Sequence, residues 1–80
     1  MDIKKGVYEV IEQITEKKIK KVTQQLNEDM GFDSLKMVLL LILLEEKFTI
    51  ELNESDMNPF VLETVDDVIA LVKKYKGENV

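Results

Sequence analysis

An all-α fold is predicted for this chain, in the form of a four-helix bundle with three long helices and one short helix. Apolar residues recur every three or four positions in three stretches of the sequence. Side chains that commonly cap helix N-termini stand before two of these stretches. Because 80 residues cannot support two hydrophobic cores, we expect a single domain over residues 1–80.

The first long helix is expected over residues 3–17, where Lys and Glu separate the members of an apolar stripe. This stripe consists of Ile3, Val7, Val10, Ile11 and Ile14. A polar stretch over residues 17–27 follows, and its few apolar residues are Ile19, Val22 and Leu26. We expect a long loop that these three side chains attach to the core, and loops of this length are often functional.

The central helix is predicted from Ser34 to Phe48, a run without Gly or Pro that is rich in Leu, Met, Glu and Lys. Asp33 is its expected N-cap, and Gly31 is suited to the turn before it. One face of this helix should be buried, and it contains Met37, Leu40, Leu41, Leu44 and Phe48.

A short third helical segment is expected around residues 54–57, capped by Asn53 and ended before Pro59. Thr64 and Asp67 then have the spacing of a capping box, with Asp in place of Glu. They predict the start of the last helix, whose apolar stripe is Val65, Val68, Ile69, Val72 and Tyr75.

The central helix also has a second set of apolar residues on the side away from the core stripe. These residues are Leu35, Val38, Leu39, Ile42 and Leu43. A helix that is apolar all round is either buried on every side or exposes a patch for a partner. Since a chain of 80 residues has little material to bury such a helix completely, partner contact is the favoured interpretation.

Composition excludes several kinds of chemistry. The sequence has no Cys and no His, so we expect no thiolate nucleophile, no imidazole base and no ordinary zinc site, and the chain is predicted not to be an enzyme. The longest apolar run, residues 37–44, is far shorter than the roughly 20 residues of a membrane span, which predicts a cytoplasmic protein with no membrane span. A monomer is the default expectation.

Charge is unevenly distributed along the chain, whose net charge is −5. Eleven acidic residues and only two lysines lie between Asn27 and Asp67, whereas both ends carry an excess of lysine. An acidic surface of this kind repels nucleic acid and favours basic partners. A charge excess that serves only solubility is the alternative interpretation.

Ser34 occupies a position that suits a phosphate group. The first turn of a helix has unpaired backbone N–H groups and the positive end of the helix dipole, and both stabilise an anion. A phosphodiester on the Ser34 hydroxyl would therefore be favoured there. Considered without its neighbours in the sequence, a serine in this position is more commonly an ordinary first-turn residue.

The segment Asp29-Met30-Gly31-Phe32-Asp33-Ser34-Leu35 resembles the D-x-G-x-D-S-L signature of acyl carrier proteins. Residues 26–31, Leu44-Glu45-Glu46-Lys47-Phe48 and Thr64-Val65 are similar to further segments of that family. The resemblance implies that a phosphopantetheinyl transferase attaches 4'-phosphopantetheine to Ser34. It also implies that the arm holds acyl intermediates as thioesters and presents them to acyl-loading and acyl-processing enzymes.

Two positions depart from the family pattern. Carriers of fatty acid synthesis usually have acidic residues two and five positions after the modified serine, and this chain has Lys36 and Leu39 there. We therefore expect a dedicated pathway, such as polyketide, hybrid or specialised acyl transfer, rather than general fatty acid synthesis. The expected partner-binding residues are Leu35, Val38, Leu39, Ile42, Glu45 and Glu46.

Other interpretations remain open at this point. An aminoacyl or peptidyl carrier would use the same fold and the same arm, and a cofactor-free interaction module would use only the second apolar face. Acidic residues at Asp29 and Asp33, or over residues 53–58, could form a metal site, although acidic turns usually face water. We expect no bound metal.

Overall fold

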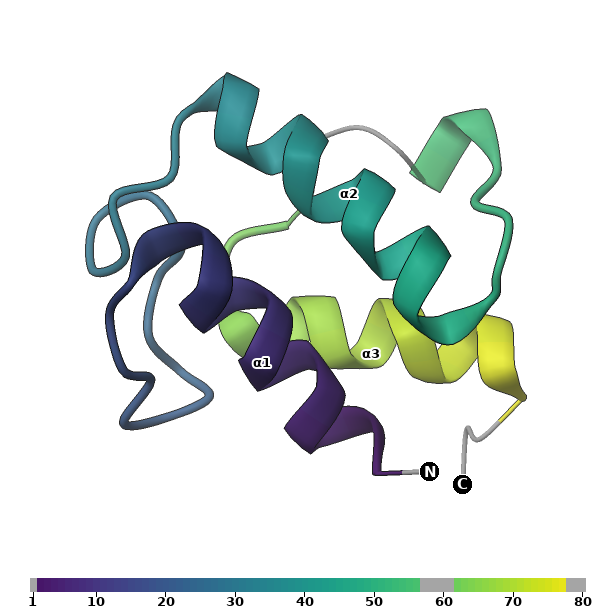
Figure 1. Ribbon diagram of the computed structural model, residues 1–80, viewed down its shortest axis with the longest axis horizontal. Coiled ribbons are helices and arrows are strands. Elements are labelled where there is room, and N and C mark those ends of the chain that lie inside the picture. Colours follow the sequence, from purple (N-terminus) through teal and green to yellow (C-terminus); the bar gives the residue numbers. More distant parts are fainter. Residues whose placement is uncertain (1, 57–61, 78–80) are drawn as a thin grey trace.

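The computed structural model describes residues 2–56 and 62–77. It contains three α-helices, α1 (Ile3–Thr15), α2 (Ser34–Phe48) and α3 (Val65–Lys76), and a 3-10 helix, η1 (Glu54–Asp56), between α2 and α3. In Figure 1, α2 lies across the top of the molecule, with α1 and α3 below it. Each of the three α-helices packs against the other two.

The prediction of an all-α protein with three long helices is confirmed. The short third segment is a single 3-10 turn of three residues over the part that is described, so the count of four helices is not confirmed. Residues 57–61, which include the expected end of this segment, lie outside the described residues. No helix within residues 2–56 and 62–77 is long and apolar enough to cross a membrane.

Both predicted N-caps of the long helices are present. The Asp33 carboxylate accepts a hydrogen bond from the Lys36 backbone N–H at 2.8 Å and begins α2. Thr64 and Asp67 form the complete capping box of α3: the Asp67 N–H donates to the Thr64 hydroxyl at 3.2 Å, and the Thr64 N–H donates to the Asp67 carboxylate at 3.0 Å. Local sequence therefore fixes where these two helices begin.

Helix α1 ends at Thr15, two residues earlier than the sequence predicted. Glu16 takes a left-handed conformation, with φ of 59°, and its N–H bonds to the Glu12 carbonyl. The Glu12 carboxylate accepts a hydrogen bond from the Ile19 N–H at 2.8 Å. These contacts turn the chain away from the helix axis directly after the last residue of the apolar stripe, Ile14.

The predicted apolar stripes form one buried cluster. It includes Val7, Val10 and Ile11 from α1, the five-residue core stripe of α2, and Val65, Val68, Ile69 and Val72 from α3. Ile14 and Tyr75 pack against this cluster while partly exposed. The core face of α2 therefore lies where the sequence placed it.

The loop from residue 16 to residue 33 is attached to the core as predicted, since Leu26 is buried and Ile19 and Val22 are partly buried. An antiparallel bridge between Gln25 and Thr64, which the sequence did not predict, also ties the loop to the start of α3. In this bridge the Leu26 N–H donates to the Glu63 carbonyl at 2.8 Å. The loop that precedes Ser34 is thereby fixed at a second point.

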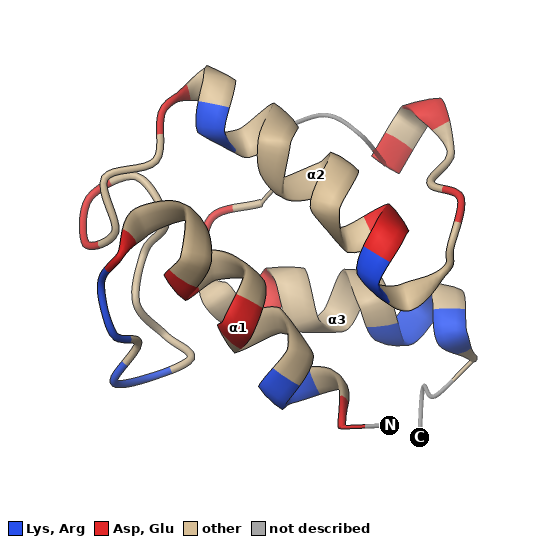
Figure 2. Cartoon of the chain, viewed as in Figure 1, with Lys and Arg blue, Asp and Glu red and all other residues tan. Residues whose placement is uncertain are grey.

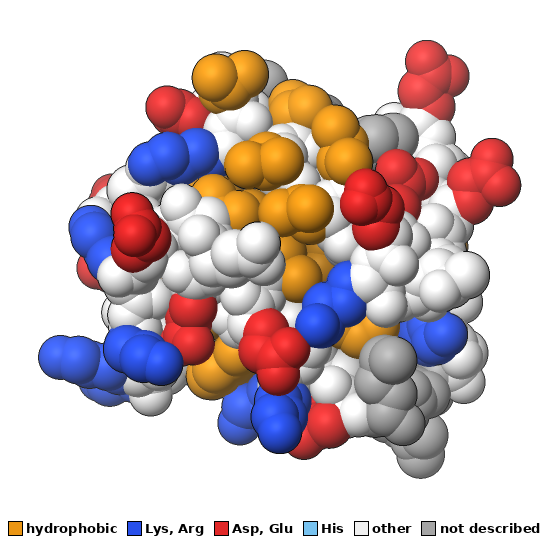
Figure 3. Space-filling model, viewed as in Figure 1, with side chains coloured by type: hydrophobic (Ala, Val, Ile, Leu, Met, Phe, Trp, Pro, Cys, Tyr) orange, Lys and Arg blue, Asp and Glu red, His pale blue; other side chains and the backbone are white. Residues whose placement is uncertain are grey.

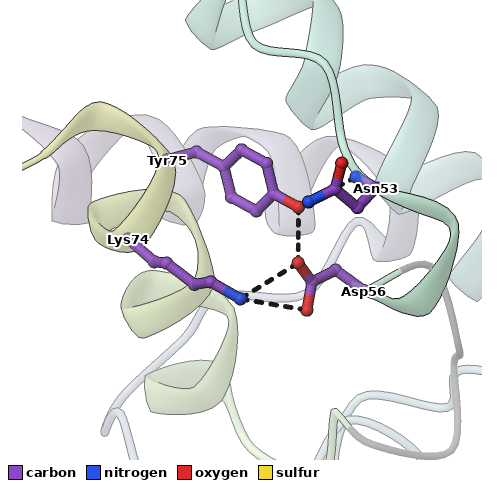
Figure 4. A network of polar contacts seen from close by, with 4 residues as sticks. All are labelled: Asn53, Asp56, Lys74 and Tyr75. Atoms are coloured by element: carbon purple, nitrogen blue, oxygen red, sulfur yellow. Dashed lines mark hydrogen bonds and ion pairs between the residues drawn. The ribbon is translucent and has the colours of Figure 1, made fainter.

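Polar contacts connect η1 to the last turns of α3 (Figure 4). The Tyr75 hydroxyl donates to the Asp56 carboxylate and accepts a hydrogen bond from the Asn53 N–H at 2.8 Å, and Lys74 forms an ion pair with Asp56 at 3.1 Å. Hydrogen bonds from Tyr75 and Lys74 hold the pKa of the Asp56 carboxyl below its ordinary value of 3.8. Because η1 contains no buried residue, this network is its main attachment among the described residues.

Candidate functional site

Ser34 is the first residue of α2 and is exposed to solvent. The helix begins at the upper left of Figure 1, directly after the long loop. The N-cap Asp33 uses its carboxylate on the Lys36 N–H, and its carbonyl accepts a hydrogen bond from the Met37 N–H at 3.0 Å. These bonds fix the first turn of α2 and leave the Ser34 side chain accessible.

The residues before Ser34 form a turn with a defined shape. Gly31, which the sequence placed in this turn, has φ of 72°, a left-handed conformation that favours glycine. Phe32 is buried, and its N–H donates to the Leu26 carbonyl at 2.9 Å. The Asp29 carboxylate accepts a hydrogen bond from the Gln25 N–H at 2.8 Å. The buried Phe32 side chain and the hydrogen bonds of Phe32 and Asp29 thus hold the turn that precedes Ser34.

A pocket of about 350 Å³ lies beside Ser34. Phe32, Met37 and Leu62 contribute buried apolar side chains to its lining, and Gln25 and Glu63 contribute polar ones. The pocket therefore lies where the long loop, the start of α2 and the approach to α3 meet. This pocket could not be predicted from the sequence, because the Gln25–Thr64 bridge beside it joins residues 39 positions apart.

The second apolar face of α2 is exposed in the structure. Leu35 is 78% exposed, and Val38, Leu39 and Ile42 are each close to 45% exposed. Figure 3 shows hydrophobic side chains gathered in one region of the surface, with acidic and basic side chains at its edges. We call Leu35, Val38, Leu39 and Ile42 the α2 patch. Leu43, expected to belong to this face, instead packs partly buried against the core.

The two predicted acidic partner residues differ in their surroundings. Glu46 is exposed at the far end of the α2 patch. Glu45 is only half-exposed, and its carboxylate accepts a hydrogen bond from the Leu52 N–H at 2.8 Å. Glu45 therefore stabilises the segment after α2, and one of its carboxylate oxygens already accepts a hydrogen bond within the protein. The sequence could not show this bond.

Residues 2–56 and 62–77 contain no group of three or more acidic side chains placed to hold a metal ion. Asp29 and Asp33, which the sequence offered as possible ligands, each bind a backbone N–H. Figure 2 shows that the charged residues of α2 lie near its two ends and that its middle is uncharged. What the site offers is thus an accessible hydroxyl, a pocket and an apolar surface.

A family model described as a phosphopantetheine attachment site matches residues 5–72 of the chain. This chain belongs to the acyl carrier protein family. A meromycolate extension acyl carrier protein from Mycolicibacterium aurum is 33% identical over 76 residues, which cover 92% of this chain and 76% of that protein. An acyl carrier protein from Borreliella burgdorferi strain ZS7 is 48% identical over 50 residues, 62% of this chain and 60% of that protein.

The chain spans 64% of the length of another relative, the meromycolate extension acyl carrier protein of Mycobacterium bovis, with 32% identity. A solved acyl carrier protein structure from Thermotoga maritima has the same fold, with a TM-score of 0.75, 20% sequence identity, and coverage of 96% of this chain and 94% of that chain. Acyl carrier proteins are carriers and not enzymes, and the family carries 4'-phosphopantetheine on a serine.

The residues around Ser34 fit a phosphopantetheine group. The hydroxyl is exposed, and the helix N-terminus favours the negative charge of a phosphodiester. Lys17 brings its ammonium nitrogen within 3.8 Å of the position that a Cβ on Gly31 would occupy, which adds positive charge near the turn. The adjacent pocket offers both polar and apolar walls.

Proposed function

We propose that Ser34 is the attachment point of 4'-phosphopantetheine and that the protein holds acyl intermediates on that arm for a set of partner enzymes. The observation that carries this proposal is the exposed hydroxyl at the first residue of α2, inside the region that the family model matches. When bound, the group supplies a terminal thiol that carries the acyl group as a thioester, a function the chain cannot provide because it has no Cys.

The chain's own residues place the attachment point. A phosphopantetheinyl transferase would join the Ser34 oxygen to the phosphorus of the arm while the pyrophosphate bond of the donor breaks. The nucleotide half of the donor would leave with its own phosphate, and the hydroxyl proton would pass to a base on the transferase. Asp33 holds the first turn of α2, and Gly31 and Phe32 fix the loop before it. Because this end of the helix is held rigidly, the arm begins from a constant position, and the tether raises the local concentration of the cargo at a docked enzyme.

Mass spectrometry tests the attachment. The protein is incubated with a promiscuous phosphopantetheinyl transferase and its donor, and one added phosphopantetheine is expected on the native chain and none on Ser34→Ala. Ser55, the other serine of the sequence, lies exposed in η1, so Ser55→Ala is the matched control and should be modified like the native protein. Modification of Ser34→Ala, or none of the native chain, would overturn the proposal.

The proposal includes a dedicated pathway, such as polyketide, hybrid or specialised acyl transfer. Lys36 and the exposed Leu39 support this part of the proposal. They occupy the positions two and five residues after Ser34, where carriers of general fatty acid synthesis usually have acidic residues. The relatives include both a carrier named for meromycolate extension and proteins named simply as acyl carrier proteins. General fatty acid synthase enzymes should act on this carrier with a lower kcat/KM than on their own carrier, and an equal kcat/KM would refute the dedicated pathway.

The class of cargo is tested separately, by loading the arm with acyl and aminoacyl donors. Loading by aminoacyl donors in place of acyl donors would refute the proposal of acyl cargo.

The α2 patch is proposed as the docking surface for the transferase and for the acyl-loading and acyl-processing enzymes. Its residues begin directly beside Ser34, so a partner seated on them would have the arm at its edge. Leu35→Gln tests this, since Leu35 is 78% exposed and its replacement should leave the unfolding midpoint unchanged. The transferase should modify the variant with a higher KM, and an unchanged KM would contradict the assignment.

A further inference from the structure

Charge is arranged with a direction along the α2 patch. Lys36 lies two residues after Ser34, at the end of the patch where the arm is attached. Glu46 is exposed at the opposite end, close to the end of α2. Figure 2 shows a basic residue in the first turn of the helix, a long uncharged middle, and both acidic and basic residues near its end.

The Lys36 side chain is partly exposed at one end of the α2 patch. Three lysines form ion pairs within the parts of the chain that are described, namely Lys18, Lys47 and Lys74, and Lys36 takes part in none of these. Lys47, the other lysine of α2, is used internally, because it binds Glu9 of α1 at 2.9 Å. A partner that covers the patch would therefore meet, beside Ser34, the charge of Lys36, which forms no ion pair with a described residue.

An unpaired charge at the edge of an apolar contact selects partners by sign. A partner with Lys or Arg opposite Lys36 must desolvate two like charges next to its own apolar contact, which slows association and weakens the complex. A partner with Asp or Glu at that position gains a complementary contact instead. The exposed Glu46, at the other end of the patch, favours a basic side chain on the partner. A partner with one acidic and one basic side chain can therefore pair with both Lys36 and Glu46 in only one orientation.

We infer that Lys36 is a specificity-determining residue. In this inference the partner enzyme carries an acidic side chain beside the mouth of its active site, opposite Lys36, and a basic side chain opposite Glu46, with apolar residues between them. This rests on the proposed function, since it takes the α2 patch as the docking surface. It adds the sign and the direction of the charges that the partner must present.

The test uses the protein loaded with its arm and an acyl transferase of the general fatty acid synthase whose carrier-docking surface is rich in Lys and Arg. Lys36→Glu should raise kcat/KM for this enzyme by about tenfold at low ionic strength. Lys36→Gln should have a kcat/KM between those of the native carrier and Lys36→Glu. The gain should shrink as salt is raised, because screening acts over about 10 Å at 0.1 M salt. Lys20→Glu, an equal charge change at an exposed loop position outside α2, is the matched control and should change kcat/KM little.

A gain that is specific to Lys36→Glu and sensitive to salt supports the inference. An unchanged or lower kcat/KM for Lys36→Glu, or an equal gain for Lys20→Glu, overturns it. Mass spectrometry of the arm on each variant separates this result from the proposed function, because a variant that carries the arm but shows no gain contradicts only the role of Lys36. Circular dichroism of each variant at 222 nm verifies that the helices are intact.

Discussion

Gly6 allows α1 and α2 to approach one another closely, and a methyl group added there is predicted to destabilise the protein. A Cβ on Gly6 would lie 2.6 Å from Cζ and 3.1 Å from Cε1 of Phe48. Phe48 is only 1% exposed, so its ring cannot move aside into solvent. Gly6→Ala therefore requires the two helices to separate or the ring to leave its rotamer.

Two effects of opposite sign determine the size of the change. Replacing Gly by Ala inside a helix stabilises the helix by about 1 kcal/mol. Overpacking a filled core costs about 1 to 3 kcal/mol. We expect the overpacking to prevail, with a net loss of about 1 kcal/mol. For a chain of this length that loss lowers the unfolding midpoint by about 4 to 8 °C.

Thermal unfolding followed by circular dichroism at 222 nm measures this change. The control repeats Gly6→Ala in a Phe48→Leu background, which lacks the ring atoms that cause the clash. There the helix effect should act alone, and the alanine should raise the midpoint. A higher midpoint for Gly6→Ala in the native background, or the same change in both backgrounds, would refute the reasoning.

Two further predictions concern the ends of the helices. Asp33→Ala should lower the free energy of unfolding by about 1 kcal/mol in urea titrations, because the N-cap of α2 is lost. Asp33→Asn should retain most of the stabilisation, since Asn is also a good N-cap. Equal losses of free energy in the two variants would exclude the cap as the cause. Tyr75→Phe should accelerate hydrogen exchange of the Asn53 amide several-fold at pH 7, because that amide loses its acceptor and Asp56 loses a donor. Since the pKa of Asp56 is lowered in the folded state, its stabilising contribution is present above the unfolded pKa near 3.8 and is lost as the pH falls through the lower folded value. The difference in exchange between the two proteins should therefore narrow as the pH falls below 3.8, and a constant difference would assign the effect to the lost hydrogen bond between Asn53 and Tyr75 alone, with no contribution from Asp56.

Much of the fold followed from local patterns in the sequence. The starts of α2 and α3 were predicted correctly, since Asp33 and Thr64 act on N–H groups only a few residues away. The core face of α2 was also correct, because helical periodicity relates residues along one element and does not depend on the neighbouring elements. The end of α1 was wrong by two residues, because the Glu12–Ile19 hydrogen bond that accompanies the turn does not appear in a periodicity.

The candidate site divides in the same way. Ser34 at the first turn of a helix and Gly31 in the turn before it were both expected from residue type and order. The task of Glu45 was not expected, because its hydrogen bond to the Leu52 N–H depends on the path of the chain after α2. The structure thus changes the interpretation of a residue that charge alone assigned to partner contact.

The sequence by itself determined three helices, the N-caps of the second and third of these, the buried face of each and the position of one serine at a helix start. All of these depend on interactions between residues close together in the chain, which residue type and spacing record directly. Only the tertiary structure decided the pocket beside Ser34, the bridge from Gln25 to Thr64, the close approach at Gly6 and the attachment of η1 to α3. These depend on contacts between distant segments, whose geometry is fixed only when the helices pack together.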